Sequence, residues 1–233
     1  MKSIKTRLIL VFTAVIFCMT TVMGLISIRV ISNNSIEEAH VDLKNMAKTS
    51  AVYIQEKINT ELWYIDALAQ NSIIKDEKLP LKDKISFFEA EAKRTGYVRF
   101  SFTDKNGNDI SSGNTTVNIS DREYFKKAIK GERAASDIII SRVTGKLAIA
   151  FASPIYLNGE ITGIFYGEMN GNILSEFANG IEYKKTGYAY VINNEGTVVG
   201  HKNTELVINQ TNDIENAKTD KSRQVLADLV KLM

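Results

Sequence analysis

The longest apolar run in the chain covers residues 8–28 and contains no charged side chain. At about 1.5 Å per residue, it is long enough for a helix to cross a hydrocarbon core of about 30 Å. Basic residues precede the run, so the positive-inside rule predicts that residues 1–7 are cytoplasmic, that the apolar run lies in the cell membrane, and that the remainder is extracytoplasmic. A cleaved signal peptide is the alternative, but it usually has a shorter apolar run and a small-residue exit. Because this run continues until Arg29 closes it, we expect a retained transmembrane helix.

A second apolar pattern follows, in a stretch over residues 32–74 that contains no Pro or Gly. Its apolar positions recur at steps of mostly three and four, which predicts a long amphipathic helix next to the membrane. The stripe consists of Ile36, Leu43, Ala47, Ala51, Ile54, Ile58, Leu62, Ile65 and Ala69. It can pack on a sheet, on a partner helix, or on both, and we expect a homodimer through this helix. A second helix is predicted over residues 82–94.

The period of the apolar pattern then changes from near four to two, which predicts antiparallel strands and the α+β class. Strands are expected over residues 97–102, 109–112, 137–143, 146–156 and 160–170. Asp104 to Gly107 forms a turn in the first hairpin. Asn158-Gly159 joins the last two strands and is the strongest hairpin signal in the sequence.

Residues 102–110 resemble residues 191–199, and a Gly-Tyr pair precedes each of the two segments. This internal repeat predicts a second sheet module that begins near residue 180 and ends in a helix over residues 216–233. The sequence stops before a counterpart of the long Asn158-Gly159 hairpin. The chain is therefore either a natural short form or the front part of a longer protein. We favour the longer protein, because a truncated sheet exposes an unpaired edge.

Between the predicted strands, Ser120 and Glu123 have the spacing of a capping box, which predicts a helix over residues 121–130. Arg122 conflicts with this start, because a cation in the first turn of a helix loses about 0.3 to 1 kcal/mol against the dipole. Its position is explained if the guanidinium faces an anion. The alternative is that Arg122 pairs in water with Asp121 or Glu123.

Composition narrows the function classes. Of the 233 residues, 29 are basic and 27 are acidic, so the net charge of +2 gives no basic surface for nucleic acid. Cys18 lies in the apolar run, and His40 and His201 are isolated and expected at the surface, so no metal or cofactor site is predicted. The common nucleotide-binding, nucleophile-elbow and zinc-protease motifs are absent from the sequence, so we expect no enzyme.

The N-terminal anchor, the long helix, two successive PAS-like antiparallel sheets and the D-R-x-Y-F pattern at residues 121–125 resemble the double Cache sensor region of bacterial chemoreceptors and sensor kinases. The resemblance covers essentially the whole chain. Its specific parts also include the Thr144-Gly145 turn with its hairpin. It implies a membrane-distal module over residues 32–179 and a truncated membrane-proximal module over residues 180–233.

In this family the distal module usually holds a small ligand, and the resemblance implies specific contacts for it. Arg122 and Tyr124 match the arginine and the first aromatic of the R-x-W-Y motif that grips a carboxylate in amino-acid sensors, and Phe125 replaces the second aromatic without its hydroxyl. The ammonium side departs from the pattern. Ser141 stands where amino-acid binders have an aspartate, and Glu168 replaces another aspartate with one more methylene.

The predicted ligand-binding residues are therefore Arg122, Tyr124, Phe125, Ser141 and Glu168. A buried ammonium needs a carboxylate partner, so a short hydroxy- or keto-acid fits these residues at least as well as an amino acid. Glu168 has an alternative role as a strand-end partner of a surface lysine. Asp137 and Arg142 are expected to be structural or solvated, and Phe151, Tyr156 and Tyr166 are expected in the core.

The architecture implies that ligand occupancy is passed through the membrane to an output module. Methyl-accepting chemotaxis is the expected output, with a histidine kinase or a cyclic-dinucleotide enzyme as alternatives of the same architecture. An adhesion or structural protein, with sheet modules that bind a partner protein, is a hypothesis from another class. The sequence contains no downstream region that decides among them.

Overall fold

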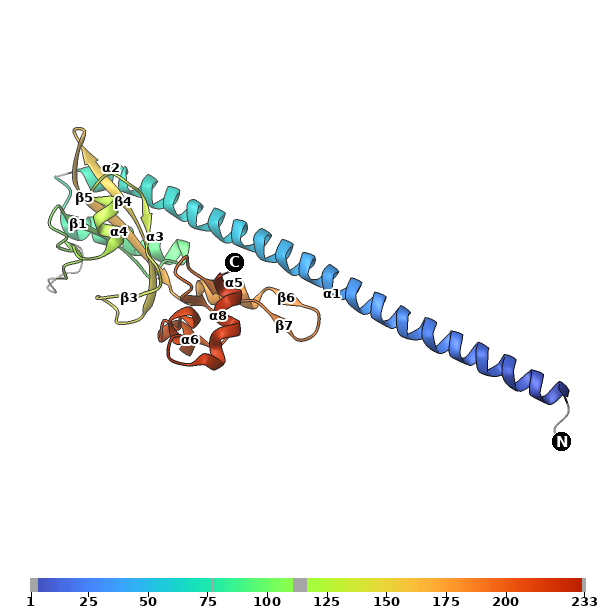
Figure 1. Ribbon diagram of the computed structural model, residues 1–233. Helices are drawn as coiled ribbons and strands as arrows, with labels where there is room; N and C mark the ends of the chain where they lie inside the picture. Colours follow the sequence, from blue (N-terminus) through green and yellow to red (C-terminus); the bar gives the residue numbers. More distant parts are fainter. Residues whose placement is uncertain (1–3, 77, 111–116, 232–233) are drawn as a thin grey trace. The chain divides into compact units, whose positions relative to one another are not determined.

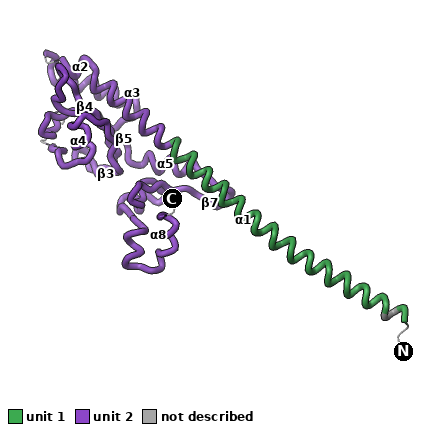
Figure 2. Tube along the Cα trace, turned by 45° about the horizontal axis from the view of Figure 1, so that its top comes forward, with its two compact units in different colours: residues 1–53 green, residues 54–233 purple. Residues whose placement is uncertain are grey.

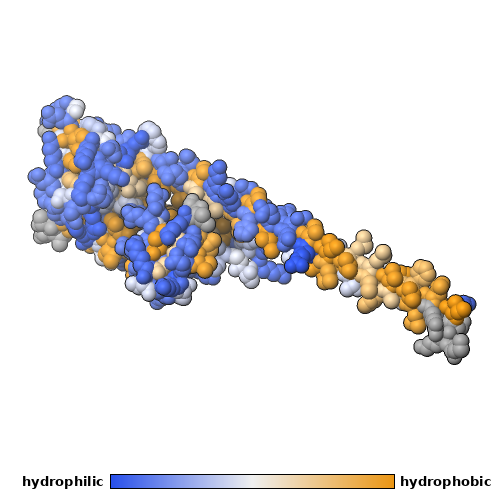
Figure 3. Space-filling model, viewed as in Figure 1, coloured by the Kyte–Doolittle hydropathy of each residue, from blue (hydrophilic) through white to orange (hydrophobic). Residues whose placement is uncertain are grey.

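The computed structural model describes residues 4–76, 78–110 and 117–231. It divides into two compact units, residues 1–53 and residues 54–233 (Figure 2). The first unit is formed by the earlier part of helix α1 (Ile4–Ala69), whose apolar side chains are exposed and appear as the orange segment in Figure 3. By length and composition α1 can cross a membrane.

Helix α1 differs from the prediction at both of its expected boundaries. It is one continuous helix, without a break after residue 28, and it ends at Ala69 rather than near residue 74. The side chain of Asn71 accepts a hydrogen bond from the Ile73 backbone N–H and starts a separate short helix, α2 (Ser72–Lys75). Capping by Asn71 thus ends the long helix earlier than its apolar spacing suggests.

The second unit is built around an antiparallel five-stranded sheet (Figure 1). Its strands are β1 (Arg99–Asp104), β2 (Ala134–Ala135), β3 (Ile139–Ile140), β4 (Leu147–Leu157) and β5 (Glu160–Asn170). The order is β1-β5-β4-β2, and β3 also pairs with β4. Asn158 and Gly159 join β4 to β5 with φ angles of 53° and 85°. These left-handed conformations suit a tight hairpin turn, and the predicted hairpin is confirmed.

One face of this sheet carries the main apolar core. The end of α1 and helix α3 (Leu81–Thr95) pack against it, with Ile65 of α1 fully buried. Phe88 of α3 lies on Phe165 with ring centroids 4.9 Å apart, and Phe165 stacks on Phe100 at 5.6 Å. The predicted helix over residues 82–94 and the upper half of the long apolar stripe are confirmed by this packing.

The opposite face is covered by the short helix α4 (Glu123–Ala128). Tyr124, Phe125 and Ala128 are buried there against small and apolar side chains of β4 and β5. Strand alternation explains the two faces, because successive side chains point to opposite sides of a sheet. We call residues 54–179 the first module and residues 180–233 the second module.

The second module is made of short elements. They are β6 (Glu182–Tyr183), β7 (Gly187–Tyr188), β8 (Val191–Ile192), β9 (Val198–Gly200), α6 (Thr204–Ile208), α7 (Asp213–Asn216), a 3-10 turn η1 (Lys221–Arg223) and α8 (Gln224–Lys231). Helix α5 (Ile173–Asn179) connects the modules, and its Leu174 belongs to the same apolar cluster as Val198 and Val207. The two modules therefore share one core within the second unit.

The internal repeat is visible in the hydrogen bonds of two turns. The Asp104 carboxylate accepts the backbone N–H groups of Asn106 and Asn108, both at 2.9 Å. The Asn193 side chain accepts the corresponding N–H groups of Glu195 and Thr197, at 3.0 and 2.9 Å. Gly107 and Gly196 both have a φ of 81°.

A second asparagine completes each turn from a distance. Asn118 donates to the backbone carbonyl of Asn106 at 2.9 Å, and Asn212 donates to that of Glu195 at 2.7 Å. Each of these asparagines lies shortly before a helix, α4 or α7. The repeat predicted from the sequence is therefore present as the same turn with the same side-chain support.

Several predicted boundaries are wrong. The strand expected over residues 137–143 shrinks to β3, and β2 and α5 were not predicted. In the first hairpin, the Ile110 N–H donates to the Phe102 carbonyl at 2.9 Å, whereas residues 111–112 lie outside the described part. The C-terminal helix over residues 216–233 is divided, because Asp220 caps η1 and α8 begins only at residue 224; residues 232–233 are not described.

The structure also tests the predicted burial of three single residues, His201, Tyr156 and Phe151. His201 is buried, because its ring packs against Tyr188 and Tyr190, and its Nδ1 accepts the Asn203 N–H at 2.8 Å. The surface position predicted for His201 is therefore wrong. Tyr156 is exposed near the end of β4, where the strand register shifts, so its predicted core position is also wrong, whereas Phe151 is in the core as expected.

Candidate functional site

The predicted capping box at the start of α4 does not form. Ser120 donates its hydroxyl, and its backbone N–H, to the Asn118 side chain at 2.6 and 2.9 Å. Glu123 instead forms an ion pair with Lys126 at 2.6 Å. Helix α4 consequently begins at residue 123, and Arg122 occupies the N-cap position without a side-chain cap. The prediction failed because Asn118, the residue that supports the preceding turn, competes for Ser120.

Arg122 lies at the start of α4. Its guanidinium donates to the Ile140 carbonyl at 3.0 Å and, within the described residues, forms no ion pair. The alternative of pairing with Asp121 or Glu123 is wrong, because both carboxylates have other partners. Arg142 binds Asp121 with two parallel hydrogen bonds of 2.7 Å, so Arg142 is structural, as expected.

Tyr124 and Phe125 point from α4 into the sheet and are almost fully buried. The Tyr124 ring lies 5.9 Å from the Tyr166 ring, and in the described part of the chain the Tyr124 hydroxyl makes no hydrogen bond. Burial raises the pKa of Tyr124, and the negative charge of Glu168 raises it further. Tyr124 therefore keeps its proton at neutral pH, and its hydroxyl can donate a hydrogen bond to an anionic ligand. Phe125 offers only an apolar surface.

Ser141 and Glu168 meet on this side of the sheet, and Ser141 also supports the neighbouring turn. Its hydroxyl donates to Glu168 Oε2 at 2.8 Å. The Ser141 hydroxyl oxygen also accepts the backbone N–H groups of Val143 and Thr144 at 3.3 and 3.2 Å, which supports the Thr144-Gly145 turn. Glu168 is 3% exposed, so the alternative role with a surface lysine is wrong.

A buried polar network that was not predicted lies beside Glu168. Arg99 of β1 donates to Asp109 at 3.1 Å and to the Tyr166 hydroxyl at 2.9 Å. Tyr166 in turn donates to Asp109 at 2.7 Å, and the Ser101 hydroxyl donates to the other Asp109 oxygen. Tyr166 is thus buried as expected, but its hydroxyl is a member of a charged network.

The charges in this network act on one another. Burial alone would raise the pKa of Asp109, but Arg99 and the hydrogen bonds from Ser101 and Tyr166 hold it below its ordinary value. For Glu168, burial prevails and raises the pKa, against opposing effects of Ser141, Arg99 and Arg122. Asp109 is therefore the permanent counter-ion of Arg99, and Glu168 is the carboxyl that gains a proton more easily.

The strand register explains how these residues meet. Arg99 lies directly opposite Glu168, and Ser101 lies directly opposite Tyr166, in the β1–β5 pair. On the other side of β5, Ala150 and Ala152 of β4 face Glu168 and Tyr166. The alternation over residues 97–102 was a usable signal, because it separates Arg99 and Ser101 from the phenylalanines of the same strand.

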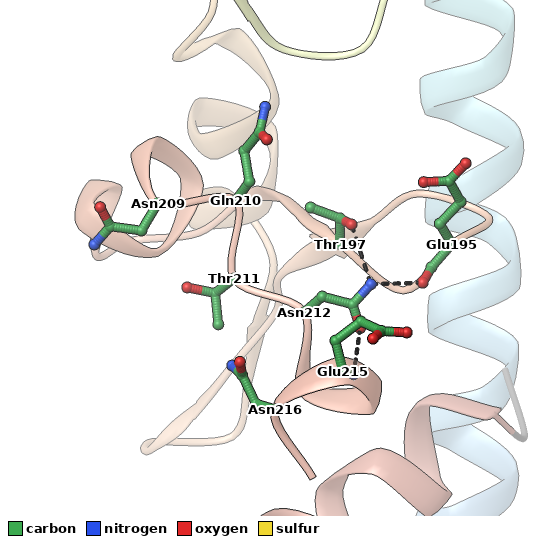
Figure 4. A pocket seen from close by; sticks show the side chains of 8 residues that line it. All are labelled: Glu195, Thr197, Asn209, Gln210, Thr211, Asn212, Glu215 and Asn216. Carbon is green, nitrogen blue, oxygen red and sulfur yellow. Dashed lines mark hydrogen bonds between the residues drawn. The ribbon is translucent and has the colours of Figure 1, made fainter. Parts of the chain in front are cut away.

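Two surface hollows of the described residues lie elsewhere. One in the second module is lined only by polar residues, shown in Figure 4: Glu195, Thr197, Asn209, Gln210, Thr211, Asn212, Glu215 and Asn216. It contains two carboxylates and no basic lining residue, so it does not suit an anionic ligand. A second hollow is lined by residues around α2. We place the candidate site at Arg122 on chemical grounds. In the described part of the chain, no His, Cys, Asp and Glu side chains gather as a metal site.

Comparison with known families decides the identity of the fold. A family model described as a Cache domain, dCache_1, matches residues 27–229. The chain belongs to the Cache domain family. A relative of this Cache chain is the methyl-accepting chemotaxis protein PscA of Pseudomonas syringae pv. tomato, which is 19% identical over 186 residues. The match covers 77% of this chain and 29% of PscA, so the chain spans under a third of that relative.

Solved structures agree on the fold. The ligand-binding domain of the Pseudomonas fluorescens chemoreceptor CtaA, in complex with L-serine, has a TM-score of 0.65 at 20% identity, with 79% of this chain and 80% of that chain covered. The sensor domain of the Vibrio cholerae histidine kinase DctB has a TM-score of 0.57 at 16% identity, covering 67% and 64%. This Cache chain therefore has the fold of chemoreceptor and sensor-kinase ligand-binding domains.

Proposed function

We propose that this chain is the extracytoplasmic sensor region of a transmembrane chemoreceptor, and that its first module binds a small carboxylate-bearing ligand. The observation that carries the proposal is Arg122, whose guanidinium has a backbone carbonyl but no ion-pair partner in the described residues. Tyr124, two residues further along, supplies a hydroxyl donor from the first turn of α4. An arginine with a neighbouring hydroxyl is a suitable binding site for a carboxylate.

The ligand reaches this site by a movement of α4 and the turn at Thr144-Gly145. Tyr124, Phe125, Ser141 and Glu168 are each at most 4% exposed, so a ligand contacts them only when these two segments separate. A ligand that prefers one arrangement of these segments shifts the equilibrium between arrangements. Its signal then passes through α1, which contacts the other face of the sheet and is expected to dimerise.

The related proteins support this proposal through their ligands and outputs. CtaA is solved with L-serine, and the amino acid chemoreceptor PctC of Pseudomonas aeruginosa is solved with GABA; both ligands carry a carboxylate. PscA is a methyl-accepting chemotaxis protein, which favours chemotaxis as the output. The DctB likeness favours a histidine kinase as the second candidate output.

The test is a thermal-shift screen of the full chain in detergent or nanodiscs against small carboxylic acids and amino acids. A ligand at 100 times its Kd stabilises the folded protein by about 2.7 kcal/mol. We expect Arg122→Ala to abolish the shift and to fold normally. Lys127→Ala, which removes a neighbouring cation of α4, is the matched control and keeps the shift. If no acid in a broad panel stabilises the chain, the first module is instead a protein-binding or spacer domain.

A further inference from the structure

The Arg99 guanidinium, a cation of the protein itself, faces Glu168. Arg99 and Glu168 are cross-strand partners on the same face of the sheet, with Nη1 of Arg99 3.9 Å from Oε1 of Glu168. The side chains are 14% and 3% exposed, so the pair is shielded from water. Of the two strand neighbours that the described register gives Glu168, Ala150 on β4 is small, and Arg99 on β1 has the long side chain.

Arg99 is also held in place. Its guanidinium donates to Asp109 at 3.1 Å and to Tyr166 at 2.9 Å, and Tyr166 donates to Asp109 at 2.7 Å. These three groups come from β1, β5 and the returning segment after β1, so their positions are set by the sheet. Arg99 therefore cannot leave Glu168 to admit another cation without breaking a buried ion pair.

Both oxygens of Glu168 face protein partners. Ser141 donates to Oε2 at 2.8 Å, and Arg99 lies beside Oε1. An ammonium group that approached Glu168 would meet the Arg99 guanidinium at short range, in a site with little water to screen the repulsion. In the described residues no carboxylate of the protein forms an ion pair with Arg122, so the site accepts a negative charge and resists a positive one.

We propose that Arg99 fills the place of a ligand ammonium beside Glu168, so that the first module selects a small hydroxy- or keto-carboxylate over the corresponding α-amino acid. This inference rests on the proposed function and specifies its ligand class. The ligand carboxylate binds at Arg122 and Tyr124, and its α-oxygen faces Glu168. An uncharged α-oxygen does not meet the repulsion from Arg99 that an α-ammonium meets there.

The first test uses three matched pairs of probes, glycolate with glycine, L-lactate with L-alanine, and L-malate with L-aspartate, titrated calorimetrically into the full chain. Each pair exchanges an α-hydroxyl for an α-ammonium. We expect the hydroxy acid of at least one pair to bind ten times or more tightly than its amino acid. If an amino acid binds as tightly or more tightly, the inference is wrong and the proposed function stands. If none of these acids nor the wider panel binds, the proposed function fails together with it.

The second test changes the internal cation. The double variant Arg99→Gln and Asp109→Asn removes both members of the ion pair and keeps hydrogen-bonding side chains of similar size. Glu168 then lacks its built-in cation, so we expect the selectivity for the hydroxy acid to fall at least fivefold. Adding Glu168→Gln to this double variant removes the carboxylate, so the amino acid should lose the affinity that it gained in the double variant. Unchanged selectivity in a folded double variant would overturn the role of Arg99, and the probe pairs decide the ligand class if that variant does not fold.

Discussion

The two faces of the five-stranded sheet are built from the same strands but have different chemistry. On one face, Phe100 and Phe165 pack with α1 and α3 into an aromatic core. On the other, Arg99, Ser101 and Glu168, the strand neighbours of core residues, join a charged network under α4. The difference teaches that strand alternation lets the paired strands β1 and β5 supply an aromatic core on one face and a charged network on the other. Substitutions on the two faces should therefore affect different measurements.

The largest effect is expected in the aromatic core. Phe165→Ala removes a fully buried ring that packs against Phe88 and Phe100, and should lower the free energy of unfolding by about 3 to 5 kcal/mol. Urea denaturation of the full chain in detergent measures it. The control is Phe87→Ala on α3, which removes a partly exposed ring and should change stability far less. Equal effects of the two substitutions would contradict the proposed division of the faces.

The next effect is expected in the charged network. Asp109→Asn leaves the buried Arg99 without its main counter-ion and should destabilise the protein by about 3 kcal/mol. Combined with Arg99→Gln, the loss should be smaller than the sum of the two single losses by at least about 1 kcal/mol. A double-mutant cycle by urea denaturation checks this. Strict additivity would show that the two side chains do not act as a pair.

A pH dependence is expected from Glu168. Its folded-state pKa is raised above the ordinary value of 4.5 by burial, so the folded state binds more protons than the unfolded state just above that pH. The contribution of Glu168 to stability therefore decreases as pH rises from about 4.5 through the folded-state pKa. Asp109 has the opposite sign, because its lowered pKa makes stability fall as pH drops below 3.8.

The measurement is the free energy of unfolding at a series of pH values for the wild type and for Glu168→Gln. The difference between the two curves reports Glu168 together with its effect on the neighbouring charges. We expect this difference to change in favour of the variant as pH rises above 4.5. A difference that stays constant with pH would mean that Glu168 is not desolvated in the folded protein.

The smallest effect is expected at a surface contact between α1 and the residue just before the edge strand β2. Arg133, just before β2, lies 3.5 Å from the ring centre of Trp63 on α1, and the tryptophan is 62% exposed. Trp63→Ala should cost about 0.5 to 1 kcal/mol, the range of an exposed cation–π contact. Thermal unfolding measures the loss of stability. Trp63→Phe keeps an aromatic ring, so it should retain part of the stabilisation. No change for either variant would show that the contact contributes nothing to stability.

Local signals predicted the core face better than the site face. The β4–β5 hairpin followed from Asn158-Gly159 and from alternation, both of which act within a few residues. The start of α4 was missed because Ser120 is captured by Asn118. The pairing of Arg99 with Glu168 could not be derived, since it depends on the β1–β5 register and not on any local pattern. Arg122, Tyr124 and Glu168 were found through the family resemblance, and their contact with a ligand remains a prediction.

The repeated turn has a consequence for how such a protein can change its ligand. Asn118 and Asn212 support equivalent turns, and the residues four positions later are Arg122 in the first module and Asn216 in the second. Asn118 supports the first turn, whereas the Arg122 side chain donates to Ile140, so the turn and the cation depend on different side chains. Mutation at the later position can create or remove an anion-binding cation without disturbing the turn that aims it. We therefore expect single substitutions at residue 122 to change the charge that the first module accepts on an unaltered scaffold.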